Sequence, residues 1–278
     1  MREFELHRSF TGGMKLIARK RMSTSQSINR DLEPTQLVLP MTQHSGPAAE
    51  PVVEPGQAVR RGQVVGTPPE PPAVAVHASR AGTVTAVIKR AVPGGNQLIN
   101  TDCVMIEVDE SPGDAVVESD WPADPVARLN AVRDAGIVGL GGAAFPTAAK
   151  LGNELPCDLL ILNGAECEPY ISCDDVLMRE HAPGIVSGAA TMLEMLGANE
   201  CVVAIESDKP FAIQAMSDAI DAAGDDRFSV AAVPTLYPAG GERQLVEILT
   251  GKEVPSGSYP IARGCVCQNV GTAFALHR

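Results

Sequence analysis

Short apolar runs alternate with segments of helical length between residues 159 and 250, and this alternation constrains the fold more than any other feature. Continuous apolar runs are typical of strands that a sheet buries on both faces. Strands that alternate with helices form parallel sheets through right-handed crossovers. We therefore predict a Rossmann-like α/β core, which lacks the G-x-G-x-x-G dinucleotide fingerprint. The predicted strands are residues 159–162, 201–205 and 228–233, and the predicted helices are residues 174–180, 184–196, 210–223 and 242–250.

A glycine-rich segment, AGIVGLGGAAFPTAAKL, comes before the first of these strands. A loop of glycines exposes backbone N–H groups to an anion, and a helix that begins at Pro146 would add the positive end of its dipole. Open parallel sheets bind ligands at the carboxyl ends of their strands. We expect this loop, the turn 163–166 and the turn 237–242 to be three strand-to-helix junctions that meet at that edge. The open alternative is a structural turn that binds nothing.

Residues 37–110 carry short β-runs that glycine and proline interrupt. Two similar pieces, PGQAVRRGQVVG and ASRAGTVTAV, are the signature of a barrel-sandwich hybrid, the β fold of lipoyl and biotinyl carriers. The hairpin between them holds the run PPEPP where a carrier needs a modifiable lysine, so we predict a structural or docking module. Residues 111–123 are acidic and contain proline, which indicates a linker. Asp124 and Pro125 then begin a helix and open the second domain, residues 124–278.

The formal net charge of −12 argues against a nucleic-acid-binding surface, which needs clustered lysine and arginine. Residues 1–36 form an N-terminal arm that is basic over residues 1–21, and this arm is either a solvated terminus or a docking tail. The seven cysteines contain no C-x₂-C-x₂-C run, which predicts reduced thiols and no metal site. No window is apolar enough for a spanning helix, so we expect the chain itself to be soluble.

Five blocks of sequence occur in order, namely GLGGAAFPTAAKL, NGAECEPYISCDD, YPAGGERQL, LTGKEVPSG and CQNVGTAFA. Together they closely resemble the RnfC subunit of the Rnf-type ion-translocating ferredoxin:NAD oxidoreductase, and more distantly the flavin-binding subunit of respiratory complex I. The resemblance implies FMN and NAD(H) as cofactors, and 4Fe–4S clusters only in a region beyond Arg278. It also implies other subunits of a membrane electron-transport complex as partners, a ferredoxin-type carrier as an indirect partner, and a peripheral position on the cytoplasmic side of the bacterial inner membrane.

A flavin needs close approach of the backbone, a phosphate cradle, and donors for its ring and ribityl hydroxyls. Glycines would provide the approach, Lys150 would face the phosphate, and Asn163 and Asn269 would offer neutral amides. The resemblance adds Thr272 for FMN, and Phe145, Glu166 and Glu242 for the nicotinamide nucleotide. No catalytic residue is predicted, because the hydride step needs no protein acid or base. The full set of predicted cofactor-binding residues is Gly139, Gly141, Gly142, Lys150, Asn163, Glu166, Gly240, Gly241, Asn269 and Thr272.

The resemblance predicts a flavin subunit that passes electrons between NAD(H) and iron–sulfur centres, while partner subunits translocate ions. Two alternatives stay open, a docking module with a degenerate site and the flavin subunit of a soluble hydrogenase or formate dehydrogenase. Single residues have alternatives too, because Lys150 could be an exposed helix lysine, Glu166 a carboxylate at the start of a helix, and Phe145 a core residue. Leu140 and Gly241 replace an arginine and a glutamate of complex I, which favours the Rnf-type branch.

Overall fold

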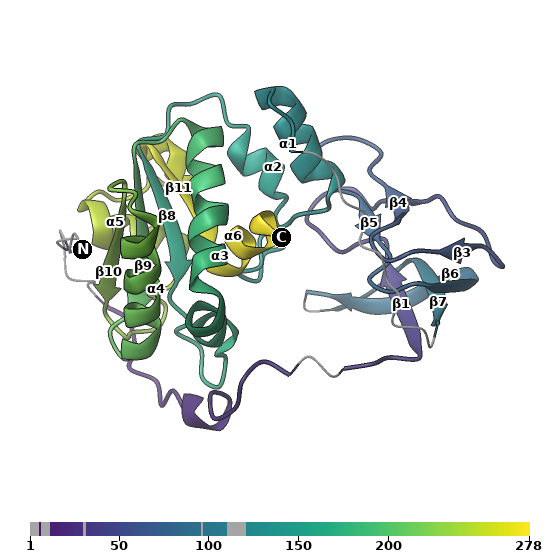
Figure 1. Cartoon of the computed structure of the whole chain (residues 1–278), viewed down its shortest axis with the longest axis horizontal. Coiled ribbons are helices and arrows are strands. Elements are labelled where there is room, and N and C mark those ends of the chain that lie inside the picture. The colour runs from purple at the N-terminus through teal and green to yellow at the C-terminus, as the bar shows by residue number, and fades with distance from the viewer. Residues whose placement is uncertain (1–5, 7–11, 30–31, 96, 110–120) are drawn as a thin grey trace. The chain divides into compact units, whose positions relative to one another are not determined.

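The computed structural model of the 278-residue chain describes residue 6 and residues 12–29, 32–95, 97–109 and 121–278 (Figure 1). Most of the predicted linker, residues 111–120, lies outside the described residues. Contacts divide the chain into Asp31–Ala149, here called the β unit, and Met1–Arg30 with Lys150–Arg278, here called the α/β unit. This division assigns residues 124–149 to the β unit, and the predicted domain boundary at residue 124 stays a prediction.

The β unit consists of antiparallel strands in two sheets, with the orders β1-β7-β6-β3 and β2-β4-β5. Its core includes Met41, Val65, Val104 and Ile106, none of which has exposed surface. This architecture confirms the predicted barrel-sandwich hybrid. The strands are β1 (Gln36–Pro40), β2 (Glu50–Pro51), β3 (Ala58–Val59), β4 (Val64–Thr67), β5 (Val76–His77), β6 (Gly82–Gly94) and β7 (Gln97–Val108).

Helix α1 (Pro125–Asp134) begins as predicted. Its N-cap residue is Asp124, whose Oδ2 accepts a hydrogen bond of 2.8 Å from the backbone N–H of Ala127. The carboxylate therefore satisfies one of the donors that the first turn of a helix leaves unpaired. Gly136 follows the helix at a φ of 71°, a backbone conformation that favours glycine. A short helix, α2 (Thr147–Leu151), crosses the division between the units.

The α/β unit contains a parallel sheet with the strand order β10-β9-β8-β11, which confirms the predicted Rossmann-like core. Three strands match the predicted runs to within two residues. The fourth strand, β11, was missed, because CVCQN is short and ends in polar residues. The strands are β8 (Leu159–Gly164), β9 (Glu200–Glu206), β10 (Phe228–Val233) and β11 (Cys265–Asn269). The helices are α3 (Cys173–Leu196), α4 (Pro210–Ala223), α5 (Glu242–Thr250) and α6 (Val270–His277), with 3₁₀ turns η1 (Lys20–Met22) and η2 (Pro260–Arg263).

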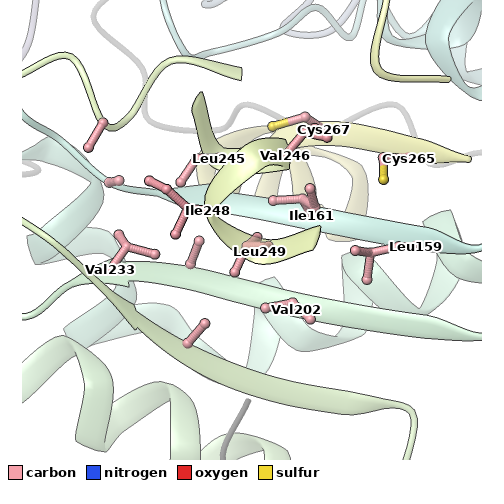
Figure 2. Packing of buried hydrophobic residues seen from close by; sticks show 14 of the residues in the cluster. Leu159, Ile161, Val202, Val233, Leu245, Val246, Ile248, Leu249, Cys265 and Cys267 are labelled. Atoms are coloured by element: carbon pink, nitrogen blue, oxygen red, sulfur yellow. The ribbon is translucent and has the colours of Figure 1, made fainter. Parts of the chain in front are cut away.

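The sheet is buried on both faces, and successive strand residues point to opposite sides. On one side Leu159 and Ile161 of β8 pack against Leu245 and Leu249 of α5, as Figure 2 shows. Leu160 and Leu162, which alternate with them in β8, are also fully buried, on the side where α3, α4 and α6 contact the strands (Figure 1). This double burial explains why the strands are continuous apolar runs rather than alternating ones.

The two predicted helices, residues 174–180 and 184–196, are the two segments of α3, which meet at a kink. Pro183 lies inside α3, and His181 has a non-helical φ of −135°. A proline has no N–H for the carbonyl four residues earlier, and its ring pushes that carbonyl away. The proline therefore causes the kink at which the two predicted helices meet. Among the described residues, no helix is long and apolar enough to cross a membrane.

Candidate functional site

The strands β8 and β11 end side by side, with Asn163 in register with Asn269. We call this end of the sheet the carboxyl edge. The Asn163 side chain joins two loops there, because its Nδ2 donates to the carbonyl of Gly240 at 2.8 Å and its Oδ1 accepts from the N–H of Ala165 at 3.0 Å. One amide thus connects the turn after β8 to the turn before α5.

Asn269 is 9% exposed and connects three elements at the same edge. Its Oδ1 accepts from the N–H of Gly271 at 2.8 Å and so caps α6. Its Nδ2 donates to Oδ2 of Asp174, at the start of α3, at 2.6 Å, and lies 3.4 Å from the carbonyl oxygen of Asn163. The structure brings both predicted asparagines together, and both use their amides to hold the loops. Thr272, also predicted, is fully buried in the first turn of α6.

Glu166 is 4% exposed and caps α3. Its two carboxylate oxygens accept from the backbone N–H groups of Asp174 at 2.8 Å and Asp175 at 3.0 Å, and Oε1 also accepts from the Cys173 thiol at 3.2 Å. The carboxylate satisfies unpaired donors and lies at the positive end of the helix dipole. Glu166 is therefore a carboxylate at the start of a helix, as one of the two alternatives held. The contact of Glu166 with a cofactor or a nucleotide stays a prediction.

Asp174 is a site residue that sequence reasoning missed. Burial raises the pKa of its carboxyl to about 7, with a further rise from the Glu166 carboxylate, while the Asn269 amide and Lys20 act in the opposite direction. Burial and the neighbouring carboxylates also raise the pKa of the Cys173 thiol to about 11, which keeps the thiol protonated as a donor to Glu166. The only sequence signal was the pair of aspartates that follows ISC.

Lys150 and Glu242 form an ion pair at the start of α5, and the Lys150 ammonium also donates to the carbonyl of Cys267 at 3.0 Å. Their side chains are 28% and 32% exposed. The sequence assigned one of these residues to the flavin phosphate and the other to the nicotinamide nucleotide. The structure thus brings a predicted cofactor cation next to a predicted nucleotide carboxylate, within reach of solvent.

The predicted glycines have different surroundings. A Cβ on Gly240 would lie 2.4 Å from the carbonyl oxygen of Ala165, so packing between the two loops requires glycine there. Gly241 is the N-cap residue of α5 at a φ of −64°, and a Cβ on it would meet only the end of the Gln244 side chain and the carbonyl of Pro238. Packing of the two loops therefore explains the glycine at position 240, whereas no backbone clash or unusual φ requires glycine at position 241.

The glycine loop belongs to the β unit, and its prediction as a strand-to-helix junction of the sheet is wrong. Among the described residues, β8 is the first strand of that sheet along the chain. The loop instead closes on itself, because the N–H of Gly139 donates to the carbonyl of Phe145 at 2.8 Å and Val138 bridges Pro146. Gly142 has a φ of 105° and open space around its Cα. The roles of Gly139, Gly141, Gly142 and Phe145 at a cofactor stay predictions.

Comparisons with known proteins agree with the resemblance found in the sequence. The Nuo51 FMN-binding domain family matches residues 132–278, and the RnfC barrel sandwich hybrid domain matches residues 8–111. The chain is 42% identical over 275 residues to a subunit of the ion-translocating oxidoreductase complex of Pseudomonas aeruginosa strain PAO1, covering 97% of this chain and 35% of that protein. It is 39% identical over 273 residues to the subunit of the same name from Edwardsiella ictaluri, covering 97% of this chain and 34% of that protein.

A solved structure is also similar, the NAD⁺-reducing [NiFe]-hydrogenase in the air-oxidized state. It has a TM-score of 0.51 and 30% identity, and the match covers 60% of this chain and 32% of that one. The chain spans about a third of the length of the two oxidoreductase-complex relatives. The matched family covers residues 132–278 and therefore contains all of the parallel sheet and its carboxyl edge. The chain belongs to the family of the Nuo51 FMN-binding domain, preceded by a barrel-sandwich hybrid domain of the RnfC type.

Proposed function

We propose that this chain is the flavin- and nicotinamide-binding part of an ion-translocating oxidoreductase complex. Electrons would pass between NAD(H) and iron–sulfur centres through FMN held at the carboxyl edge of the α/β unit. The observation that carries the proposal is the meeting of Lys150, Asn163, Glu242 and Asn269 at one edge of a sheet whose family binds FMN. The relatives named as subunits of such a complex, and the NAD⁺-reducing hydrogenase, support the same class of reaction.

The donors at the carboxyl edge fit a phosphorylated, hydroxyl-bearing ligand. An ammonium group has three N–H donors, and that of Lys150 has two partners among the described residues, Glu242 and the carbonyl of Cys267. The Asn163 amide has two N–H donors and uses one of them on Gly240. One donor of each group is thus left to meet a phosphate or a ribityl hydroxyl. The ammonium would also supply the charge that a phosphate requires.

These side chains contribute position and charge rather than acid–base chemistry. FMN, when bound, supplies the chemistry by accepting an electron pair with a hydride and releasing electrons singly. Asn163 fixes the distance between the turn after β8 and the turn before α5, because its amide bonds to both. Glu242 holds Lys150 at the carboxyl edge. Because these loops are already held in place, binding a ligand costs less conformational entropy than it would with flexible loops.

The place of the chain in its complex follows from the same proposal. The 4Fe–4S clusters would lie in the part of the longer relatives that this chain does not span. A ferredoxin-type carrier would exchange electrons with the complex, while partner subunits move the ion. The chain would attach through those partner subunits at the cytoplasmic side of the bacterial inner membrane.

The proposal is tested by titrating the purified chain with FMN and then adding NADH without oxygen. The wild type is expected to take up one FMN and to lose the yellow absorbance of the flavin when NADH is added. Lys150→Met is expected to raise the dissociation constant for FMN about tenfold, since it removes the cation and its free donor. The matched control is Lys252→Met, because Lys252 is an exposed lysine just after α5. Folded wild-type protein that takes up no FMN, or a Lys150→Met variant that binds it as the wild type does, would defeat the proposal.

A further inference from the structure

Residues 14–23, part of the basic N-terminal arm, lie against the loops of the carboxyl edge (Figure 1). We call residues 14–23 the strap. The N–H of Tyr170 donates to the carbonyl of Ala18 at 2.9 Å, and the hydroxyl of Ser23 donates to the carbonyl of Tyr170 at 2.7 Å. Tyr170 has a φ of 67°, which residues other than glycine rarely adopt. The strap therefore holds this unusual conformation from both sides of the residue.

Lys20 makes the central contact between the strap and the loop 166–171. Its ammonium donates to the carbonyl of Glu166 and, at 2.6 Å, to the carbonyl of Ile171. These two carbonyls belong to the first and last residues of the loop, so one side chain joins the two ends. Glu166 caps α3 with its carboxylate while its carbonyl accepts from Lys20. The strap and the start of α3 are thus connected through a single residue.

A second anchor connects the strap to the turn before α5. Met14 and Tyr237 exchange two backbone hydrogen bonds, of 2.7 and 2.9 Å, in an antiparallel bridge. Tyr237 begins the turn that contains Gly240 and leads to Glu242. The chain after β8 and this turn are therefore connected in two places, by the strap at the loop 166–171 and by the hydrogen bond from Asn163, near the end of β8, to Gly240. Both loops border the carboxyl edge, where we propose that FMN binds.

The charge of Lys20 suits this position. Burial raises the pKa of Asp174, and its neighbours Glu166 and Glu168 add to the rise, whereas Lys20 and the Asn269 amide lower it. Burial raises the pKa of Asp175 too, and Lys20 again acts against the rise, beside Arg179 and Lys209. The ammonium is thus one of the cations that compensate the acidic groups at the start of α3. A neutral side chain of the same length would keep neither this charge nor the two hydrogen bonds.

We propose that the strap sets the spacing of the two carboxyl-edge loops for the flavin, and that Lys20 is its positioning residue. This inference rests on the proposed function of the edge. It assigns a role to a segment of the N-terminal arm. From its composition alone, this arm could be either a solvated terminus or a docking tail. It also predicts that loosening the strap weakens cofactor binding, because the loops that the strap connects change their spacing.

The test compares the wild type with Lys20→Met, Lys20→Arg and Lys15→Met. Lys15 is exposed and lies in the same strap, so its variant controls for the loss of one positive charge. Without cofactor, hydrogen exchange in peptides that cover residues 166–172 is expected to become about tenfold faster in Lys20→Met and to stay unchanged in Lys15→Met. The dissociation constant for FMN is expected to rise about fivefold in Lys20→Met. Lys20→Arg keeps the positive charge and the N–H donors. Its exchange rate in residues 166–172, its dissociation constant for FMN and the visible circular dichroism of its bound FMN should therefore equal those of the wild type.

Two results separate this inference from the proposed function. Unchanged exchange in Lys20→Met, or faster exchange with unchanged FMN affinity, would overturn the role of the strap while the flavin site stands. Wild-type protein that binds no FMN would overturn the proposed function and the positioning role with it. If Lys20→Met does not fold, Ser23→Ala removes the hydroxyl that donates to the carbonyls of Tyr170 and Lys20, with little loss of volume, and it is expected to give a weaker effect in the same direction.

Discussion

Asp174→Asn should make the stability of the α/β unit less dependent on pH. Asp174 is partly buried beside Glu166, and both this burial and that carboxylate raise its pKa from an ordinary value of 3.8 to about 7. A carboxyl with a raised folded pKa binds more protons in the folded state than in the unfolded state between the two values. The contribution of Asp174 to wild-type stability therefore falls as pH rises from about 4 to about 7, and it is not regained above that range. Asparagine has no proton to lose, and its Oδ1 can still accept from Asn269.

The size of the effect follows from the pKa values. The interval between about pH 5 and a pKa of about 7 corresponds to about 2–3 kcal/mol, at about 1.4 kcal/mol for each pH unit. Relative to the wild type, Asp174→Asn should gain that amount when the pH is raised from about 5 to about 8. Nearby Lys20, Glu168 and Asn269 are present in both proteins, so the pH dependence that these residues themselves contribute is removed when the two proteins are compared.

Urea unfolding measures this gain at both pH values. Far-ultraviolet circular dichroism is a suitable probe, because most described helices belong to the α/β unit. Asp226→Asn is the matched control, since Asp226 is exposed. A difference between Asp174→Asn and the wild type that is the same at both pH values would refute the reasoning, because it would show that Asp174 is charged throughout the range.

Two further substitutions test packing within the α/β unit, and a third tests a helix cap in the β unit. Lys209→Met leaves the fully buried Glu206 without its cation, so we expect a loss of about 3–5 kcal/mol by urea unfolding near neutral pH, and a smaller loss in acid. Gly188→Ala would place a Cβ 1.8 Å from the carbonyl oxygen of Ala273, so α6 must shift, and a cost below about 1 kcal/mol would contradict this packing. Asp124→Ala removes the N-cap of α1 and should cost about 1 kcal/mol in thermal unfolding, whereas no cost would mean that α1 adds little to the β unit.

The helices and strands with local signals could be predicted from the sequence. Helix α4 begins at Pro210 and is followed by Gly224 at a φ of 65°, so both of its ends were encoded by single residues. Gly251 marks the end of α5 in the same way, at a φ of 69°. The strand β10 was a continuous apolar run, and its predicted range matches the observed one. In each case neighbouring residues determine the local backbone without help from distant parts of the chain.

Contacts between distant residues could not be predicted in this way. Lys20 and Glu166 are 146 residues apart, and no local pattern pairs a lysine side chain with a backbone carbonyl. Glu166 caps α3 from seven residues before the helix, outside the spacing of a local capping box. Asn163 and Asn269 were expected at one edge, but their bonds to Gly240 and Asp174 depend on the register of β8 with β11. Side-chain partners at the site are thus properties of the assembled sheet.

The most direct test of the central claim is to map FMN on the chain by hydrogen exchange with and without the cofactor. The account predicts slower exchange in three separate stretches that meet at the carboxyl edge, residues 163–166, 240–242 and 269–272. Protection confined to other surfaces, with these three stretches exchanging as fast as before, would contradict it.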